Sequence, residues 1–220
     1  MLQRWKKNLF YNLASPLMRL NSIKYKYLNT IKKNNYVKIH LGPGKKNYIP
    51  GWINIDANMF SAKCDMWLDL RYKLPFQNSS VNYCYSHHMI EHLPNMKKHL
   101  EDIFRILKSG GVYRIGGPNG DSAIKKFIEN DANWFSSFPD NRESIGGRFE
   151  NFIFCRQEHL TILTFSFLNE ILKKIGFTNI IKLLPAKETS NPDIFNDCLK
   201  FENENDFKVP HTLIIECQKP

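Results

Sequence analysis

VKIHLGPGKKNYIPGWINID, residues 37–56, is the stretch that decides the fold of this chain. Its apolar, β-branched start predicts a strand, and Gly42 and Gly44 let the backbone turn tightly and approach a ligand. A second predicted strand ends at Asp56, whose two oxygens can accept both hydroxyls of a ribose. Because a Gly-x-Gly turn after a strand is commonly only a turn, this stretch alone leaves nucleotide binding open.

Further strand and helix patterns follow at regular spacing. Short apolar runs at residues 66–70, 81–86 and 112–116 predict three more strands. Residues 96–108 carry apolar side chains on one helical face, and the Ser-Gly-Gly at 109–111 ends this predicted helix. Strands that alternate with helices predict a mostly parallel sheet.

The carboxyl ends of the predicted strands carry small or polar residues, namely Gly42, Asp56, Asp69 and Ser86. In a parallel sheet these ends meet at one edge, and ligands bind beyond it. We therefore predict a ligand site that these residues share.

Several motifs in this order resemble class I S-adenosylmethionine-dependent methyltransferases of the type 11-like group, in particular small ones found among cell-surface polysaccharide genes. The motifs are IHLGPG with GWINID, DLRYKLPFQNSSVNYCYSHHMIEHL, IFRILKSGGVYRIGGPN, and LNEILKKIGFTNI with HTLIIECQKP. The resemblance covers residues 36–220. It implies an α/β, Rossmann-like, doubly wound sheet of seven strands with helices on both faces. The sheet is mostly parallel, with an antiparallel last strand at 211–218 paired near 179–185.

The resemblance also implies S-adenosylmethionine as the cofactor and assigns residues to it. Gly42 and Gly44 fall at the methionine end, Asp56 at the ribose, and Asp69 with Leu70 at the adenine. The full expected set is Leu41, Gly42, Pro43, Gly44, Asp56, Ala57, Asp69, Leu70 and Ser86.

Two positions depart from the pattern of the family at large. His40 stands where an acidic residue often precedes the glycines, and residues 45–47 (KKN) replace a third glycine. The resembled sub-group tolerates both. Dinucleotide dehydrogenases are a competing interpretation, but they expect a fuller glycine pattern and an acidic residue about 20 positions on. Here Asp56 lies 14 positions after Gly42.

Length and cysteine content limit the class of protein. A chain of 220 residues predicts one domain with an ordinary core. The 5 cysteines are odd in number and contain no C-x-x-C pair, so they predict neither a disulfide framework nor a cysteine zinc site. No apolar run is long enough to span a bilayer, and the basic start lacks a signal-peptide pattern. We expect a cytoplasmic protein.

The net charge of +10 is concentrated at the N-terminal end, because residues 1–55 contain 11 Lys and Arg and no Asp or Glu. Apolar residues recur there at spacings of 3 or 4, although Pro16 is expected to break the helix in two. The repeating positions are Leu2, Trp5, Leu9, Leu13, Leu17 and Leu20.

Residues 1–35 are interpreted as an extension to a methyltransferase domain at 36–220. Its stripe can pack on the domain, or residues 1–33 can contact an anionic inner membrane surface. Nucleic-acid contact is a third reading, and no nucleic-acid module supports it.

Two segments depart from the strand and helix rhythm. Residues 121–160 are rich in aromatic side chains and follow the fifth predicted strand, and residues 187–210 separate the last two strands. Each is a candidate insertion at the substrate site; for the first, an ordinary helix and loop is an equal alternative.

The segment SHHMIEHL supplies the candidate catalytic groups. His87 and His88 leave the fourth strand at the ligand edge and can act as a general base or orient the acceptor. Helical geometry would place His88 and His92 on one face, and Glu91 with His92 can serve a structural role at the mouth of the site. His88, Glu91 and His92 also fit the H-x-x-E-H zinc-protease pattern, which the sheet context disfavours. No metal is expected.

Two further polar residues are candidates. His159 lies where the resembled sub-group tends to carry a histidine and can be a second base, or a cap before the helix that follows. Arg114 on the fifth strand can bind an anionic acceptor or pair on the sheet surface.

The sequence therefore predicts a methyltransferase that modifies oxygen on a sugar or sugar-linked group, including a phosphate-like one, for capsule or lipopolysaccharide. The acceptor is expected to be a carbohydrate or nucleotide-linked small molecule and no nucleic acid. A small metabolite or RNA is the alternative acceptor, and a binding protein without catalysis is the alternative class.

Overall fold

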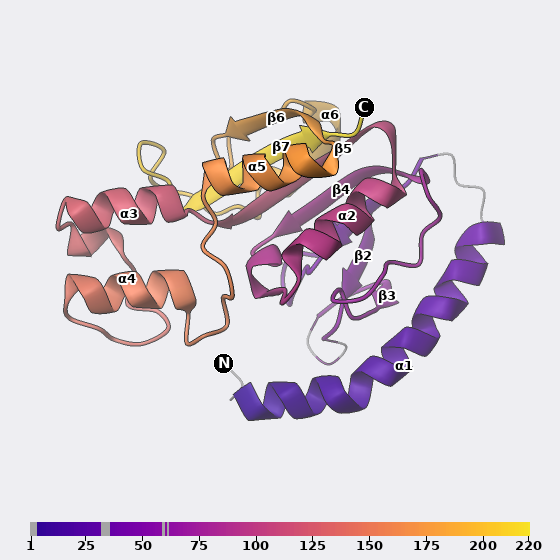
Figure 1. Ribbon diagram of the computed structural model, residues 1–220, viewed down its shortest axis with the longest axis horizontal. Coiled ribbons are helices and arrows are strands. Elements are labelled where there is room, and N and C mark those ends of the chain that lie inside the picture. Colours follow the sequence, from indigo (N-terminus) through magenta and orange to yellow (C-terminus); the bar gives the residue numbers. More distant parts are fainter. Residues whose placement is uncertain (1–3, 32–35, 59, 61) are drawn as a thin grey trace.

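A seven-stranded sheet forms the centre of the molecule, and its strands lie in the order β3-β2-β1-β4-β5-β7-β6 (Figure 1). The computed structural model describes residues 4–31, 36–58, 60 and 62–220. The strands are β1 Lys38–Leu41, β2 Ile53–Asp56, β3 Met66–Trp67, β4 Val81–His87, β5 Leu107–Pro118, β6 Thr178–Leu183 and β7 Thr212–Gln218.

The directions of the strands follow the expected pattern. The pairs of β1 with β2 and β4, of β2 with β3, and of β4 with β5 are parallel. β7 runs antiparallel to both of its neighbours, β5 and β6. The predicted mostly parallel sheet with an antiparallel last strand is therefore confirmed, with the last strand paired to the segment expected.

Helices cover both faces of this sheet. α2 (Met96–Ile106) and α5 (Phe165–Ile175) pack on the face that presents Cys84 and Tyr113. Successive strand residues point to opposite faces, so Tyr85 and Val112 face the other way, where they bury Phe195 of α6 (Pro192–Leu199). α6 belongs to the segment 187–210 and covers this face of the sheet, whereas the end of the same segment, Val209 and Pro210, accepts hydrogen bonds from Trp134 and Asn119 beyond β5.

The boundary between α2 and β5 differs from the predicted one. The helix ends at Ile106, before the Ser-Gly-Gly, because Leu107 already pairs with Val81 in the sheet. Gly110 supplies the turn with φ +77°, a conformation that glycine adopts without strain. Asn95 caps the start of the helix by accepting from the Lys98 N–H.

The side chain of Arg114 is fully buried and binds neither acceptor nor solvent. Its Nε and Nη2 donate to the two carboxylate oxygens of Glu202 at 2.8 Å each, and Nη1 donates to Glu216 at 2.6 Å. The guanidinium thus holds the segment after α6 against β5 and β7. The alternative in which Arg114 binds an anionic acceptor is therefore wrong.

Replacing Arg114 tests this role. Arg114→Met leaves two buried carboxylates without their cation, so we expect the free energy of unfolding in urea to fall by about 3–5 kcal/mol. Lys97→Met is the control, because Lys97 contacts Glu101 in solvent at 3.7 Å and its loss should cost at most about 0.5 kcal/mol. Equal effects from the two variants would contradict the assignment.

His40 anchors the loop between β1 and β2 from inside the sheet. Its Nδ1 lies 3.0 Å from the Asn54 side-chain oxygen, and the Asn54 amide donates to the carbonyls of Ile49 and Trp52. Burial lowers the pKa of His40 to about 4, so the ring is neutral at pH 7. The basic residue at this position therefore has a structural role.

The depressed pKa makes stability depend on pH. The unfolded chain takes up this proton near pH 6.5, but the folded chain takes it up only near 4, so acidification across that window favours unfolding. His40→Gln replaces the ring N–H with an amide N–H donor, which does not titrate. We expect the slope of unfolding free energy against pH in this window to drop by about 1.4 kcal/mol per pH unit. Parallel curves for the two chains would refute the shift.

The segment 121–160 forms a small aromatic core beyond β5, to which Val209 of the segment 187–210 also contributes. α3 (Gly120–Ile128), the short helix η2 (Ala132–Trp134) and α4 (Ile145–Phe154) pack together to the side of the sheet (Figure 1). Their shared core contains Ala123, Trp134, Phe135, Ile153 and Val209, with Ile145, Phe149 and Phe152 against it.

The N-terminal helix α1 (Arg4–Ile31) lies along the outer edge of the molecule beside β3 and curves along its length (Figure 1). It is one continuous helix, so the prediction that Pro16 breaks it is wrong; the proline sits inside the helix. Among the side chains of α1 that the structure describes, those of Ala14, Ser15 and Met18 are buried. The exposed positions include Leu13, so the alternative in which the leucine stripe packs on the domain is also wrong.

Two residues of the predicted stripe fall outside what the structure describes: Leu2 altogether, and Trp5 as regards its side chain. No helix among the described residues is both long enough and apolar enough to cross a membrane.

Candidate functional site

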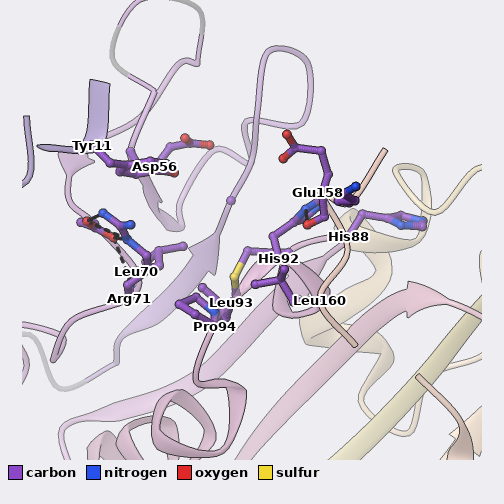
Figure 2. A pocket seen from close by; sticks show the side chains of 15 residues that line it. Tyr11, Asp56, Leu70, Arg71, His88, His92, Leu93, Pro94, Glu158 and Leu160 are labelled. Carbon is purple, nitrogen blue, oxygen red and sulfur yellow. Dashed lines mark hydrogen bonds and ion pairs between the residues drawn. The ribbon is translucent and has the colours of Figure 1, made fainter. Parts of the chain in front are cut away.

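A cavity of about 410 Å³ opens at the carboxyl ends of β1, β2 and β4. Figure 2 shows that Tyr11, Asp56, Leu70 and Arg71 line one side of it. The other side carries His88, His92, Glu158 and Leu160, and Leu93 and Pro94 lie between. The remaining lining residues are Gly42, Ala57, Asp69, Met89 and Gln157.

The turn after β1 lets the backbone come close to the cavity. Gly42 has φ +71° and donates its N–H to the Ile55 carbonyl at 2.9 Å. A Cβ at this position would lie 2.9 Å from Cγ of Met89, which is closer than van der Waals contact. Only glycine combines this backbone conformation with the space that the cavity leaves.

Asp56 ends β2 and joins two loops. One carboxylate oxygen accepts the Gly44 N–H at 2.9 Å, and the other accepts the Asn58 N–H at 2.8 Å. Each oxygen retains a lone pair, so the carboxylate can also accept two hydroxyl donors from the cavity. Ala57 beside it accepts the indole N–H of Trp67 at 2.8 Å, which fixes the backbone here.

Asp69, beyond β3, is held by two neighbours. Arg71 donates to both carboxylate oxygens, from Nη2 at 2.6 Å, and the Ser15 hydroxyl of α1 donates at 2.6 Å. Burial raises the pKa of Asp69, but these hydrogen bonds outweigh it and hold the pKa below its ordinary value. The carboxylate is therefore ionised, and α1 is tied to the cavity.

Tyr11 of α1 completes this side. The Arg71 guanidinium lies over its ring at 3.9 Å, within the range of a cation–π contact. An aromatic ring and a guanidinium plane offer flat surfaces on which a base can stack. The N-terminal extension thus contributes to the site directly.

A histidine cluster forms the opposite side around the buried carboxylate of Glu91. His88 Nδ1 lies 3.3 Å and His92 Nε2 lies 3.8 Å from Glu91 Oε1. Burial raises the pKa of Glu91, but the two histidines outweigh it and keep the pKa below its ordinary value. His88 is in a left-handed conformation with φ +50°, and its side chain is 44 % exposed toward the cavity side.

The segment that holds these groups is not the α-helix that the zinc-protease pattern requires. Ile90–His92 is a short 3-10 turn, and His88 precedes it outside any helix. His88 and His92 both lie near Glu91 Oε1 and both line the cavity, but the turn that places them is not an α-helix, so the expected helical geometry is wrong. Glu91, His92 and His159 each offer an atom that can ligate a metal ion, within 4.8 Å of one another.

His159 and His87 lie behind the cavity wall. His159 Nδ1 donates to the Ile153 carbonyl at 3.0 Å, its ring packs on His92, and burial lowers its pKa. Burial also holds the pKa of His87 well below its ordinary value, and the ring lies against Tyr85 and Gly116. Neither lines the cavity, whereas His88 does.

The structure thus brings together six of the predicted site residues. Gly42, Asp56, Ala57, Asp69, Leu70 and His88 all line the cavity. The predicted residues that do not line it are Leu41, Pro43, Gly44, Ser86, His87 and His159. Ser86 is fully buried and shares a 2.7 Å hydrogen bond with the hydroxyl of Tyr113, which makes it a core residue. Gly44 acts through its hydrogen bond to Asp56.

Sequence reasoning missed the lining residues that come from outside the sheet. Gln157, Glu158 and Leu160 come from the end of the segment 121–160, which therefore reaches the cavity. Tyr11 and Arg71 were missed because no strand pattern contains them. The signal for Arg71 was its position two residues after Asp69 in a loop.

Comparisons with known proteins agree with this geometry. Residues 60–115, from before β3 into β5, match a family described as a methyltransferase domain. No curated protein matches the chain.

Solved structures share the fold at low sequence identity. A S-adenosylmethionine-dependent methyltransferase from Archaeoglobus fulgidus is 16 % identical with a TM-score of 0.54, and covers 95 % of this chain and 99 % of its own. One from Thermotoga maritima is 14 % identical with a TM-score of 0.54, and covers 99 % and 96 %. Phosphoethanolamine N-methyltransferase 2 from Haemonchus contortus, solved with S-adenosylhomocysteine, is 17 % identical with a TM-score of 0.53, and covers 90 % and 52 %.

Residues 60–115 thus match a methyltransferase domain, and the solved structures show that the chain shares the fold of S-adenosylmethionine-dependent methyltransferases. The named proteins differ in what they act on, so the acceptor does not follow from them.

Gly42 provides a test of the cavity. Gly42→Ala adds a Cβ at positive φ beside Met89, so we expect affinity for S-adenosylhomocysteine, measured by calorimetry, to fall at least about tenfold. Gly146→Ala in α4 is the matched control, because a Cβ there meets no atom within 4 Å. Unchanged affinity in the Gly42 variant would show that the ligand binds elsewhere.

Proposed function

We propose that this protein transfers the methyl group of S-adenosylmethionine to an oxygen on a sugar or sugar-linked group. The observation that carries the proposal is the division of one cavity into two chemically different sides. Asp56, Asp69 and Tyr11 form a side suited to a nucleoside, and His88 with Glu91 forms a side suited to a hydroxyl acceptor.

The nucleoside side fits the adenosine of the cofactor. A cavity of about 410 Å³ lies in the range of small-molecule sites. Asp56 retains acceptor lone pairs for ribose hydroxyls, and Gly42 leaves the backbone close to the ligand. Tyr11, Leu70 and Arg71 offer apolar and planar surfaces for adenine. When bound, S-adenosylmethionine supplies an electrophilic methyl group on a sulfonium.

The opposite side fits the needs of an alcohol acceptor, which reacts better when a base removes its proton. Glu91 is ionised and buried, and its charge favours a proton on the nearby Nδ1 of His88. That tautomer leaves Nε2 of His88 free to accept the proton of a hydroxyl. His88 is therefore the proposed base, and Glu91 is its positioning residue.

The sugar class of acceptor is supported by the resemblance to enzymes of polysaccharide genes and by polar groups near His88. Gln157 and Glu158 line this side and can bond several hydroxyls at once. We place the reaction in the cytoplasm, where five free cysteines stay reduced, as a step in capsule or lipopolysaccharide synthesis. A small metabolite or RNA acceptor, or a binding role without catalysis, are the alternatives that the experiments below separate.

The first experiment is a calorimetric titration with S-adenosylhomocysteine, with NAD and Zn²⁺ as controls. We expect saturable binding of the first, weakened about a hundredfold in Asp56→Ala, because hydrogen bonds to a charged group are lost. Asp197→Ala, an exposed carboxylate on α6, is the matched control and should bind normally. Binding of NAD or Zn²⁺ without binding of S-adenosylhomocysteine would show that the protein does not use S-adenosylmethionine and catalyses a different kind of reaction.

The second experiment separates binding from turnover. Methyl transfer from S-adenosylmethionine to a panel of nucleotide sugars and oligosaccharides is read by mass spectrometry. We expect His88→Ala to lower kcat about 10²–10⁴-fold while affinity for S-adenosylhomocysteine stays within about threefold. His87→Gln should keep turnover, because His87 lies off the cavity.

Three outcomes would overturn parts of the proposal. Full activity in His88→Ala would show that His88 is not the general base. Methylation of RNA or amines but of no sugar would show that the acceptor is not a sugar or sugar-linked group. Cofactor binding with no transfer to any acceptor would favour a binding protein.

A further inference from the structure

The helix α1 presents two different apolar faces. Its inner face buries Ala14, Ser15 and Met18 against the domain, and Tyr25 packs on the main core. Its outer face carries a second apolar row that contacts no core cluster. An amphipathic helix of a globular protein normally has one such face, so the outer row indicates an interaction surface.

The outer row is regular and strongly exposed. Its members recur at spacings of three or four, which places them along one side of a helix, and each is between 50 % and 70 % exposed. They are Leu9, Leu13, Leu17, Leu20, Ile23 and Tyr27. The rest of the molecule leaves this side uncovered, because α1 forms its outer edge beside β3 (Figure 1).

Basic residues flank the row. Lys6 and Lys24 fall at helical spacing in line with the leucines, one toward each end, and Arg19 lies beside them over the ring of Tyr72. No acidic residue occurs in the sequence before Asp56. The described charged side chains near the row are therefore all basic, and they lie toward its two ends.

We propose that the outer face of α1, defined by this row and its flanking lysines, docks on an anionic membrane surface. Leucines enter the boundary between headgroups and acyl chains, while lysines at the ends reach the anionic headgroups. The same arrangement explains why the helix is basic without being long and apolar enough to cross a bilayer.

Charge distinguishes this partner from the alternatives. A second copy of the chain would bring two positively charged helices face to face, which is unfavourable. Nucleic acid would use the lysines but would leave the leucine row in water. An anionic lipid surface satisfies both the apolar row and the charges.

Docking would also fix the position of the cofactor cavity relative to the membrane surface. Tyr11 lines the cavity from the inner face of α1, and Ser15 holds Asp69. Because a helix with side chains is about 10 Å thick, the nucleoside side of the cavity lies about one helix diameter from the docked lipid surface.

The test uses the full chain and co-sedimentation with vesicles of phosphatidylcholine and phosphatidylglycerol in equal parts, or of phosphatidylcholine alone. We expect binding to the anionic vesicles only, weakening as salt is raised. Leu13→Glu/Leu17→Glu should bind these vesicles at least about tenfold more weakly, since two apolar anchors become charged.

The matched control is Ile124→Glu/Ile128→Glu, two exposed residues at the same spacing on α3. It should bind the vesicles like the unaltered chain. Circular dichroism and S-adenosylhomocysteine affinity should be unchanged in both variants, because neither pair points into the cavity. Failure of docking is thus distinguishable from failure of the proposed function.

Three results would overturn docking. The first is that the unaltered chain binds neither kind of vesicle, and the second is that both pairs of substitutions weaken binding equally. The third is a dimer, detected by light scattering, that Leu13→Glu/Leu17→Glu separates, which would identify the row as a contact between two copies.

Discussion

The parallel pairing of β1 between β2 and β4 is the constraint on which the site depends. Leu41 pairs with Ile55 on one side and with Ser86 on the other, so three strands end at the same level. The backbone beyond each end must turn, and the residues at those turns meet. Asp56 then links the turns by accepting the Gly44 N–H. Without this register, the glycine turn, the carboxylate and the histidines would lie on separate surfaces.

The sheet, the Gly42 turn and the carboxylates of Asp56 and Asp69 could be predicted from the sequence because local patterns encode them, whereas Tyr11 and Arg71 on the same side could not. Strand alternation and the Gly42 turn depend on neighbours a few positions apart. What the pattern could not give were partners fixed only by packing. From the sequence, Arg114 is a candidate for acceptor binding or for pairing on the sheet surface. Its actual partner Glu202 lies far along the chain and is brought beside it only by folding. His87 and His88 are adjacent in sequence, yet the end of β4 turns one into the core and the other toward the cavity. The two-faced character of α1 was hidden for the same reason.

The buried carboxylate of Glu91 shows how the fold makes a polar site from an apolar surrounding. A charge without water is costly, and the close approach of His88 and His92 offsets that cost. The cost is tolerated at a turn that the core holds rigid, with Ile90 fully buried beside it. The buried carboxylate of Glu91 lowers the stability of the fold, but it keeps the two imidazole rings in fixed positions at the mouth of the cavity.

The clasp of Ser15, Asp69 and Arg71 has a consequence for how related chains vary. It joins a residue of the N-terminal helix to two residues more than fifty positions later, through one carboxylate. Loss of the serine would leave a buried anion with one donor fewer, and loss of the aspartate would leave the arginine without its partner. Among relatives these three positions should therefore change together. Their covariation would be a sequence signature for chains in which this helix belongs to the catalytic domain.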